Sequence, residues 1–234
     1  MEPNRPLSQV KTQAAEQAGQ HSISDKIANH SVLRNTYMLL SMTLLFAAGV
    51  AGAAMTLNLP HPGLIITLVG YFGLLFAVEK TKNSGLGLVF CFALTGFMGY
   101  TLGPILNAYL TFLPNGEQIV MMALGGTGTI FVGLSAYVLA TGGRYQNWGM
   151  ALMVGILVAF LCGIGAIVFN MPTLSLAVSA MFVILMAGLI MYQTGEIIHG
   201  GETNYISATV TLFVSIYNLF LSLMHLLAAF SGDD

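Results

Sequence analysis

The sequence predicts an all-α membrane protein, a seven-transmembrane-helix bundle with the seventh helix central. Three observations support this prediction, and composition is the first. Of the 234 residues, 56% are hydrophobic and only 7% are charged, which lies outside the range of soluble globular domains. The second is that the apolar residues gather in seven runs, each near the ~20 residues that a helix needs to cross a bilayer. The third is a row of polar residues along the last run.

A polar tail precedes the first run. Residues 1–30 contain no apolar stretch and no small-residue cleavage site, so they are not a signal peptide, and we expect a disordered or weakly helical cytoplasmic tail. The transmembrane domain is expected to fill residues 31–234. Its spans are predicted at roughly 32–56, 63–78, 85–110, 118–140, 148–169, 173–195 and 205–230. Gly, Pro and Asn separate them, as is typical of turns.

The basic residues predict the orientation, because short loops rich in Lys and Arg stay on the cytoplasmic side. With seven spans, all seven Lys and Arg residues fall on one side, whereas six spans would scatter them over both. The loops at 57–62, 112–117 and 170–172 contain neither Lys nor Arg. The N-terminus is therefore expected in the cytoplasm and the C-terminus outside it, in the periplasm.

The last apolar run carries polar residues three or four positions apart. They are Asn204, Ser207, Thr211, Ser215, Asn218, Ser222 and His225, called here the polar stripe. On a helix they fall within an arc of about 80°. Polar side chains turn away from lipid toward neighbouring helices, since lipid offers them no hydrogen-bond partner. The seventh helix is therefore predicted to lie at the centre of the bundle.

Other candidate sites are weaker. Glu196 and His199 have the Glu-x-x-His spacing of di-iron bundles, but that chemistry needs two such pairs and further carboxylates. The glycines at 125–128 lack the Lys and the preceding strand of a phosphate loop. Cys91 and Cys162 lie inside apolar runs, where packing is favoured over a disulfide. We therefore expect no metal site and no cofactor.

Catalysis and nucleic-acid binding are not expected either. No Asp, Glu, Lys or Arg lies deep in a predicted span, and no nucleophile-and-base pair is visible there. No catalytic residue is therefore assigned. His225 could relay protons, but a lone His among Ser and Asn is more often a hydrogen-bonded packing residue. A net charge of -2 gives no reason to expect a nucleic-acid partner.

Several segments together resemble a known family. They are Tyr192-Gln193-Thr194, residues 200–206, residues 217–220, residues 32–37, residues 62–65 and residues 99–107. The chain resembles the Bax-inhibitor-one family of seven-span proteins, and within it the bacterial YccA branch. The resemblance implies a multi-pass protein of the bacterial inner (plasma) membrane that binds and modulates the ATP-dependent membrane protease FtsH. It also implies contact with the membrane regulators that associate with FtsH.

The chain departs from the wider family at two positions. Many members carry an Asp pair linked to a pH-dependent calcium leak, and the matching positions here are Gln193 and Ser215. Two neutral side chains cannot change charge between pH 5 and 8, so the resemblance does not imply that activity. Two hypotheses follow. The first is a slowly degraded substrate that competes with other substrates of FtsH. The alternative is an ion (calcium or proton) leak channel or transporter lined by the polar stripe.

Overall fold

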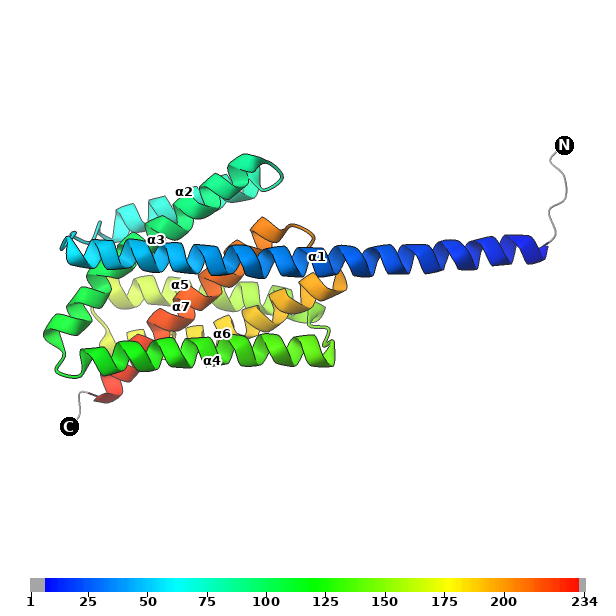
Figure 1. Ribbon diagram of the computed structural model, residues 1–234. Coiled ribbons are helices and arrows are strands. Elements are labelled where there is room, and N and C mark those ends of the chain that lie inside the picture. The colour runs from blue at the N-terminus through cyan, green and yellow to red at the C-terminus, as the bar shows by residue number, and fades with distance from the viewer. Residues whose placement is uncertain (1–6, 232–234) are drawn as a thin grey trace.

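A computed structural model describes the backbone of residues 7–231 and the side chains from residue 30 onward. Within that range it contains seven α-helices (Figure 1). They are α1 (Leu7–Thr56), α2 (Leu64–Thr81), α3 (Gly85–Phe112), α4 (Gly116–Thr141), α5 (Gly149–Val168), α6 (Pro172–His199) and α7 (Tyr205–Ser231). A short 3-10 turn, η1 (Gln146–Trp148), leads into α5.

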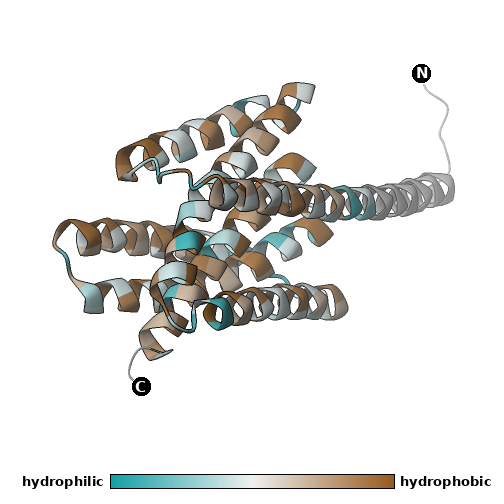
Figure 2. Ribbon diagram, turned by 60° about the vertical axis from the view of Figure 1, so that its left-hand side comes forward, coloured by the Kyte–Doolittle hydropathy of each residue, from teal (hydrophilic) through white to brown (hydrophobic). Residues whose placement is uncertain are grey.

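All seven helices contain a segment that is long and apolar enough to cross a membrane. The prediction of seven spans is therefore confirmed, and hydrophobic residues predominate along the spans in Figure 2. The predicted ends differ by a few residues. The sixth span was expected to end at residue 195, but α6 continues to His199, because polar residues can prolong a helix beyond the apolar part of its sequence.

Helix α7 lies at the centre of the bundle, as predicted. It contacts α1, α2, α3, α4 and α6 (Figure 1). Phe213, Leu212 and Leu219 of α7 are almost completely buried in the larger hydrophobic cluster. A smaller cluster surrounds Phe220 and Met224 near the other end of the helix. The wall of the bundle is thus packed around one helix.

Helices α1 and α3 pack closely because α3 offers glycine where they meet. A Cβ atom added to Gly99 would collide with the Ala47 carbonyl oxygen, and one added to Gly103 would lie 2.8 Å from the Ala51 carbonyl oxygen. Small residues let the backbones of membrane helices approach each other and gain van der Waals contact. We call this contact the α1–α3 seam.

Four helix ends meet on one face of the bundle. The Asn204 amide donates to the Lys82 carbonyl oxygen, which joins the start of α7 to the end of α2. A ring nitrogen of His199 lies 3.0 Å from the Gly142 carbonyl oxygen, which joins the ends of α6 and α4. Lys80 and Lys82 lie at the end of α2, Arg144 follows the end of α4, and Arg34 lies at the start of the first candidate span, so these basic residues belong to this face. Helix α7 ends on the opposite face (Figure 1).

Helix α1 extends well beyond this face. The candidate span within it begins at His30, and the backbone of residues 7–29 continues the same helix away from the bundle (Figure 1). The structure gives residues 7–29 a helical backbone. The division of the chain into a tail at 1–30 and a transmembrane domain at 31–234 stays a prediction.

Candidate functional site

The polar stripe starts just outside α7, at Asn204. Asn204 is in phase with the stripe but precedes the first residue of α7, and its side chain caps the helix. Its Oδ1 accepts hydrogen bonds from the backbone N–H groups of Ile206 (2.9 Å) and Ser207 (3.1 Å). These N–H groups have no carbonyl partner inside the helix, so the side chain stabilises the helix start.

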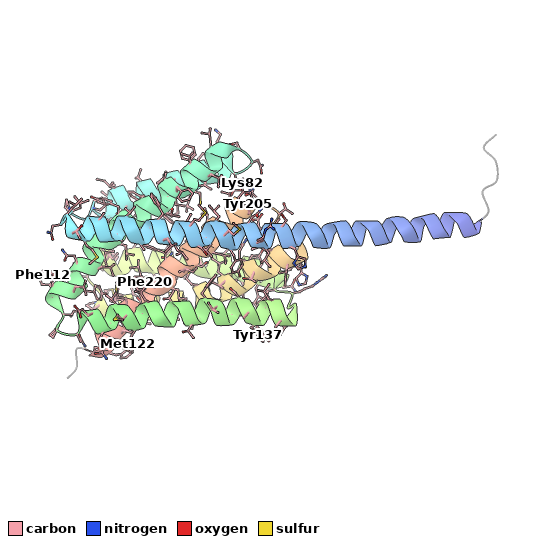
Figure 3. All side chains as sticks on the ribbon, viewed as in Figure 1. Lys82, Phe112, Met122, Tyr137, Tyr205 and Phe220 are labelled. Atoms are coloured by element: carbon pink, nitrogen blue, oxygen red, sulfur yellow. The ribbon has the colours of Figure 1, made fainter. Side chains whose placement is uncertain are left out.

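The same Asn204 side chain ties α7 to the loop between α2 and α3. Its Nδ2 donates to the Lys82 carbonyl oxygen (3.0 Å) and to Asn83 Oδ1 (2.9 Å). Lys82 and Tyr205 accordingly lie together at one end of the bundle in Figure 3. The Lys82 ammonium also pairs with Glu79, and this hydrogen bond raises the pKa of Lys82.

The rest of the stripe runs along the edge of the buried face of α7. Ser215 and Ser222 are buried, whereas Ser207, Thr211, Asn218 and His225 are half-buried. Ser215 Oγ donates to the Thr211 carbonyl oxygen (2.7 Å), and Asn218 Nδ2 donates to the Val214 carbonyl oxygen (2.8 Å). These bonds within one helix satisfy polar groups locally. The stripe is therefore not one connected network.

His225 makes the contact between the stripe and α6. Its Nδ1 lies 2.8 Å from Ser179 Oγ. A hydrogen bond between side chains of two spans stabilises their packing by about 0.6 kcal/mol on average. The geometry thus gives His225 a hydrogen-bonded role between α6 and α7.

The two positions at which the resemblance implies an Asp pair in other members, Gln193 and Ser215, are both buried. Ser215 is completely buried, and Gln193 is only 5% exposed. Gln193 Nε2 has no hydrogen-bond partner within the described part of the chain, and the same holds for Thr36 Oγ1 and Ser135 Oγ. Buried groups of this kind usually bind ordered water.

Two of the hydrogen bonds that join α7 to other spans lie off the stripe and were missed from the sequence. Thr209 Oγ1 lies 3.2 Å from the Thr36 carbonyl oxygen, and Thr101 Oγ1 lies 3.1 Å from the Tyr217 hydroxyl. Both join α7 to another helix. A Thr or Tyr in an apolar run is weak evidence for a hydrogen bond between helices, because a Thr hydroxyl often bonds only to its own helix.

A cavity of about 430 Å³ opens on one side of α7, and we call it the α2–α5 cavity. Its walls come from five helices. They are Thr67, Leu68, Tyr71 and Phe72 of α2; Phe97, Met98 and Thr101 of α3; Met153, Ile156, Leu157 and Phe160 of α5; Phe182, Met186 and Leu189 of α6; and Val214, Tyr217 and Asn218 of α7. Among stripe residues, Asn218 alone lines this cavity.

The weaker candidates are not brought together. The Glu196 carboxylate lies against Gly201, while His199 contacts Gly142. Among the residues searched, no group of three His, Cys, Asp or Glu side chains is placed to hold a metal ion. Cys91 and Cys162 are both free. The glycines at 125–128 lie within α4.

Comparisons with known proteins agree with this architecture. Residues 29–232 match the model of the family described as inhibitor of apoptosis-promoting Bax1. The modulator of FtsH protease YccA from Escherichia coli K12 is 49% identical over 91% of this chain and 96% of its own length. A second relative, the inner membrane protein YccA of Escherichia coli O6:H1, matches equally. An uncharacterised Pseudomonas aeruginosa protein is 46% identical over 93% of this chain and its own full length. The chain therefore belongs to the Bax1-inhibitor family of multi-span membrane proteins.

Proposed function

We propose that this chain is an integral inner-membrane protein that binds and modulates FtsH, and that it acts as a slowly degraded competing substrate, without catalytic activity of its own. The observation that carries the proposal is the match, over nearly the whole of both chains, to a relative named as a modulator of FtsH protease. Membrane regulators that associate with FtsH are proposed as secondary partners.

The proposal places the basic face of the bundle in the cytoplasm. Arg34, Lys80, Lys82 and Arg144 support this orientation, because basic residues in short loops are retained on that side. The N-terminal helix then projects into the cytoplasm, and the C-terminal end of α7 faces the periplasm. This is the arrangement that a cytoplasmic ATP-driven protease requires to reach the projecting segment.

The segment at residues 7–29 is suited to be the site where degradation starts. Figure 1 shows it leaving the bundle with no other described helix beside it. Tertiary packing supplies most of the stability of a helix in water, so a helix without neighbours is easily unwound. An unfolding motor can therefore unwind residues 7–29 at little cost in free energy.

The bundle behind that segment resists extraction. Its α1–α3 seam lies directly in line with the tail, since both belong to α1. Extracting α1 from the membrane by pulling on residues 7–29 requires α1 to be separated from α3 at this closely packed contact. A segment that is easily gripped and a bundle that is difficult to extract together make a slow substrate, which occupies the protease for longer than other substrates do.

The alternative, an ion leak channel or transporter, has less support. Gln193 and Ser215 are neutral, and the hydroxyl of Ser215 bonds within its own helix. In the described spans, the middle of each helix contains no Asp, Glu, Lys or Arg. Ion-coupled transport usually requires such a group at membrane depth.

A pulse-chase experiment tests the proposal. The lifetimes of the full chain and of a chain lacking residues 1–29 are measured with and without FtsH, beside the lifetime of a second FtsH substrate. Truncation should lengthen the lifetime of the chain, leave it bound to FtsH in mild detergent, and further protect the second substrate. Docking through the bundle and initiation at the tail would then be separate properties.

The matched control is a variant that keeps the length of the tail but changes its sequence. Residues 7–29 are replaced by a Gly/Ser segment of equal length, which remains accessible to the protease. This variant should still be degraded if the tail acts as an unstructured handle. Unchanged lifetimes of both proteins after truncation would contradict the competing-substrate mechanism and favour the channel.

A further inference from the structure

The α2–α5 cavity opens sideways, toward the region that lipid occupies. The described backbones of α2 and α5 do not approach each other closely, and the rings of Phe72 and Phe160, with centroids 5.6 Å apart, bridge the two helices. Phe72, Met153 and Leu157 line the cavity and are also 49%, 74% and 56% exposed at the surface. The mouth of the cavity therefore lies between α2 and α5, so a molecule can enter it from the bilayer.

Polar groups gather at the inner end of this cavity. Tyr71, Thr101 and Tyr217 each come from the middle part of their helices, and Asn218 follows Tyr217. They therefore lie near the middle of the bilayer. No Lys, Arg, Asp, Glu or His lines the described cavity. An ionised ligand would be buried there without a compensating charge, at a high cost in free energy, so the ligand is neutral.

The hydrogen bonds already present leave identifiable free positions. The Thr101 hydroxyl donates its single proton to the Met98 carbonyl oxygen (2.8 Å), so the Tyr217 hydroxyl must donate to Thr101 Oγ1. The Tyr217 oxygen then remains an acceptor. Asn218 uses Nδ2 to bond Val214, which leaves its Oδ1 as a second acceptor.

The Tyr71 hydroxyl supplies the donor. It has no hydrogen-bond partner among residues 30–231, and it lines the same cavity as Tyr217. A plain acyl chain would leave the Tyr71 hydroxyl without a partner and the acceptor positions of Tyr217 and Asn218 unused, which is unfavourable in a buried site. The site is therefore complementary to a ligand that has oxygen atoms able to accept and donate hydrogen bonds.

Aromatic walls indicate the shape of that ligand. Six aromatic side chains line the cavity: Tyr71, Phe72, Phe97, Phe160, Phe182 and Tyr217. Aromatic rings pack favourably against other rings. The volume lies within the range of about 300–1,000 Å³ that is common for small-molecule sites.

We propose that the α2–α5 cavity binds an uncharged, membrane-soluble molecule with a planar ring that carries carbonyl or hydroxyl oxygens, as the head group of a quinone does. Tyr71 donates to a ligand carbonyl, and Asn218 Oδ1 or the Tyr217 oxygen accepts from a ligand hydroxyl. Any apolar tail leaves between α2 and α5. This proposal goes beyond the protease function, and its test uses the purified protein alone.

The test measures thermal unfolding of the full chain in lipid nanodiscs with increasing mole fractions of decylubiquinone. A ligand that binds the folded state raises Tm with its concentration. Dodecanol and dodecane are the comparison probes, since they offer a hydroxyl without a ring and a chain without oxygen. Decylubiquinone should raise Tm at a lower mole fraction than either.

Variants locate the binding. Tyr71→Phe removes the donor and should raise the half-saturating mole fraction about five- to tenfold, the effect of one hydrogen bond. Leu157→Trp fills the mouth and should abolish the shift. Its matched control is Leu161→Trp, one turn along α5 and similarly exposed at 58%, but outside the cavity. Met153→Phe replaces Leu157→Trp if that variant does not fold.

Three results would overturn the proposal. They are the absence of a decylubiquinone effect on the wild-type chain, an unchanged effect when the mouth is filled, and equal stabilisation by dodecanol or dodecane. An unchanged half-saturating mole fraction in Tyr71→Phe would overturn the role of that hydroxyl.

Discussion

The α1–α3 seam and the gap between α2 and α5 are built from opposite kinds of residue. At the seam, Gly99 and Gly103 bring two backbones into contact, whereas at the gap two helices meet through the rings of Phe72 and Phe160. Lipid provides no hydrophobic driving force between spans, so close packing decides which contacts are strong. The comparison therefore divides the bundle into a closely packed side and an adaptable side.

The largest expected effect comes from disrupting the seam. Gly99→Val would place a branched side chain against the Ala47 carbonyl oxygen, and we expect a loss of about 3 kcal/mol in the free energy of unfolding. The matched control is Gly49→Val on α1, where an added Cβ meets no atom within 4 Å. Thermal unfolding in mild detergent measures both. Equal stability of the two variants would contradict the close packing of the seam.

A smaller loss of stability is expected from substitution of Asn204, which joins the start of α7 to the loop between α2 and α3. Asn204→Ala removes the cap of α7 and the tie to Lys82, at a cost of about 1–2 kcal/mol. Asn204→Asp keeps the oxygen that accepts from Ile206 and Ser207 but loses the donor to Lys82. If the cap contributes most of the stability, Asn204→Asp should keep most of the stability that Asn204→Ala loses. Chemical unfolding of both variants separates the two contributions, and equal losses would show that the tie dominates.

On the adaptable side, the expected loss in the free energy of unfolding is smaller than that at the seam. Phe72→Ala removes the ring pair with Phe160 and a second ring pair with the neighbouring Tyr71, each worth about 0.5–1.5 kcal/mol. Phe76→Ala on the same helix is the control, because Phe76 is 69% exposed and forms no ring pair among the described residues. We expect Phe76→Ala to leave the free energy of unfolding unchanged. A loss from Phe72→Ala as large as that from Gly99→Val would remove the distinction between the two sides.

The smallest effect concerns the surface pair of Lys82 and Glu79. The pair raises the pKa of Lys82 above its usual value of 10.5, so its stabilisation is present below that pH and is lost as pH rises through the raised pKa. Glu79→Gln should lower stability at pH 7 by less than about 0.5 kcal/mol. Unfolding at pH 7 and pH 11, at low and high salt, tests this. A large salt-independent loss at pH 7 would contradict a solvent-screened pair.

Much of the fold could be predicted from the sequence, because span number and order depend on apolar runs and the residues that separate them. The central position of α7 followed from its polar residues. The site was predicted less well. Asn204 falls in phase with the stripe, but phase alone does not reveal that a residue ends outside the helix as its cap.

The α2–α5 cavity could not be predicted at all. It depends on the rotation of five helices about their own axes, which brings Tyr71, Thr101 and Tyr217 together from distant parts of the chain. Each of these residues is unremarkable within its own span. Only the assembled bundle shows that their hydroxyl groups share one space.

The helix at residues 7–29 also sets how far the chain can reach. At about 1.5 Å per residue it extends about 35 Å from the start of the first span. Unwound at about 3.3 Å per residue, the same segment extends about 75 Å. A partner whose entrance lies between these two distances can engage residues 7–29 only after their helix unwinds. Shortening the segment stepwise should then stop engagement at a threshold length that measures the distance of that entrance from the membrane.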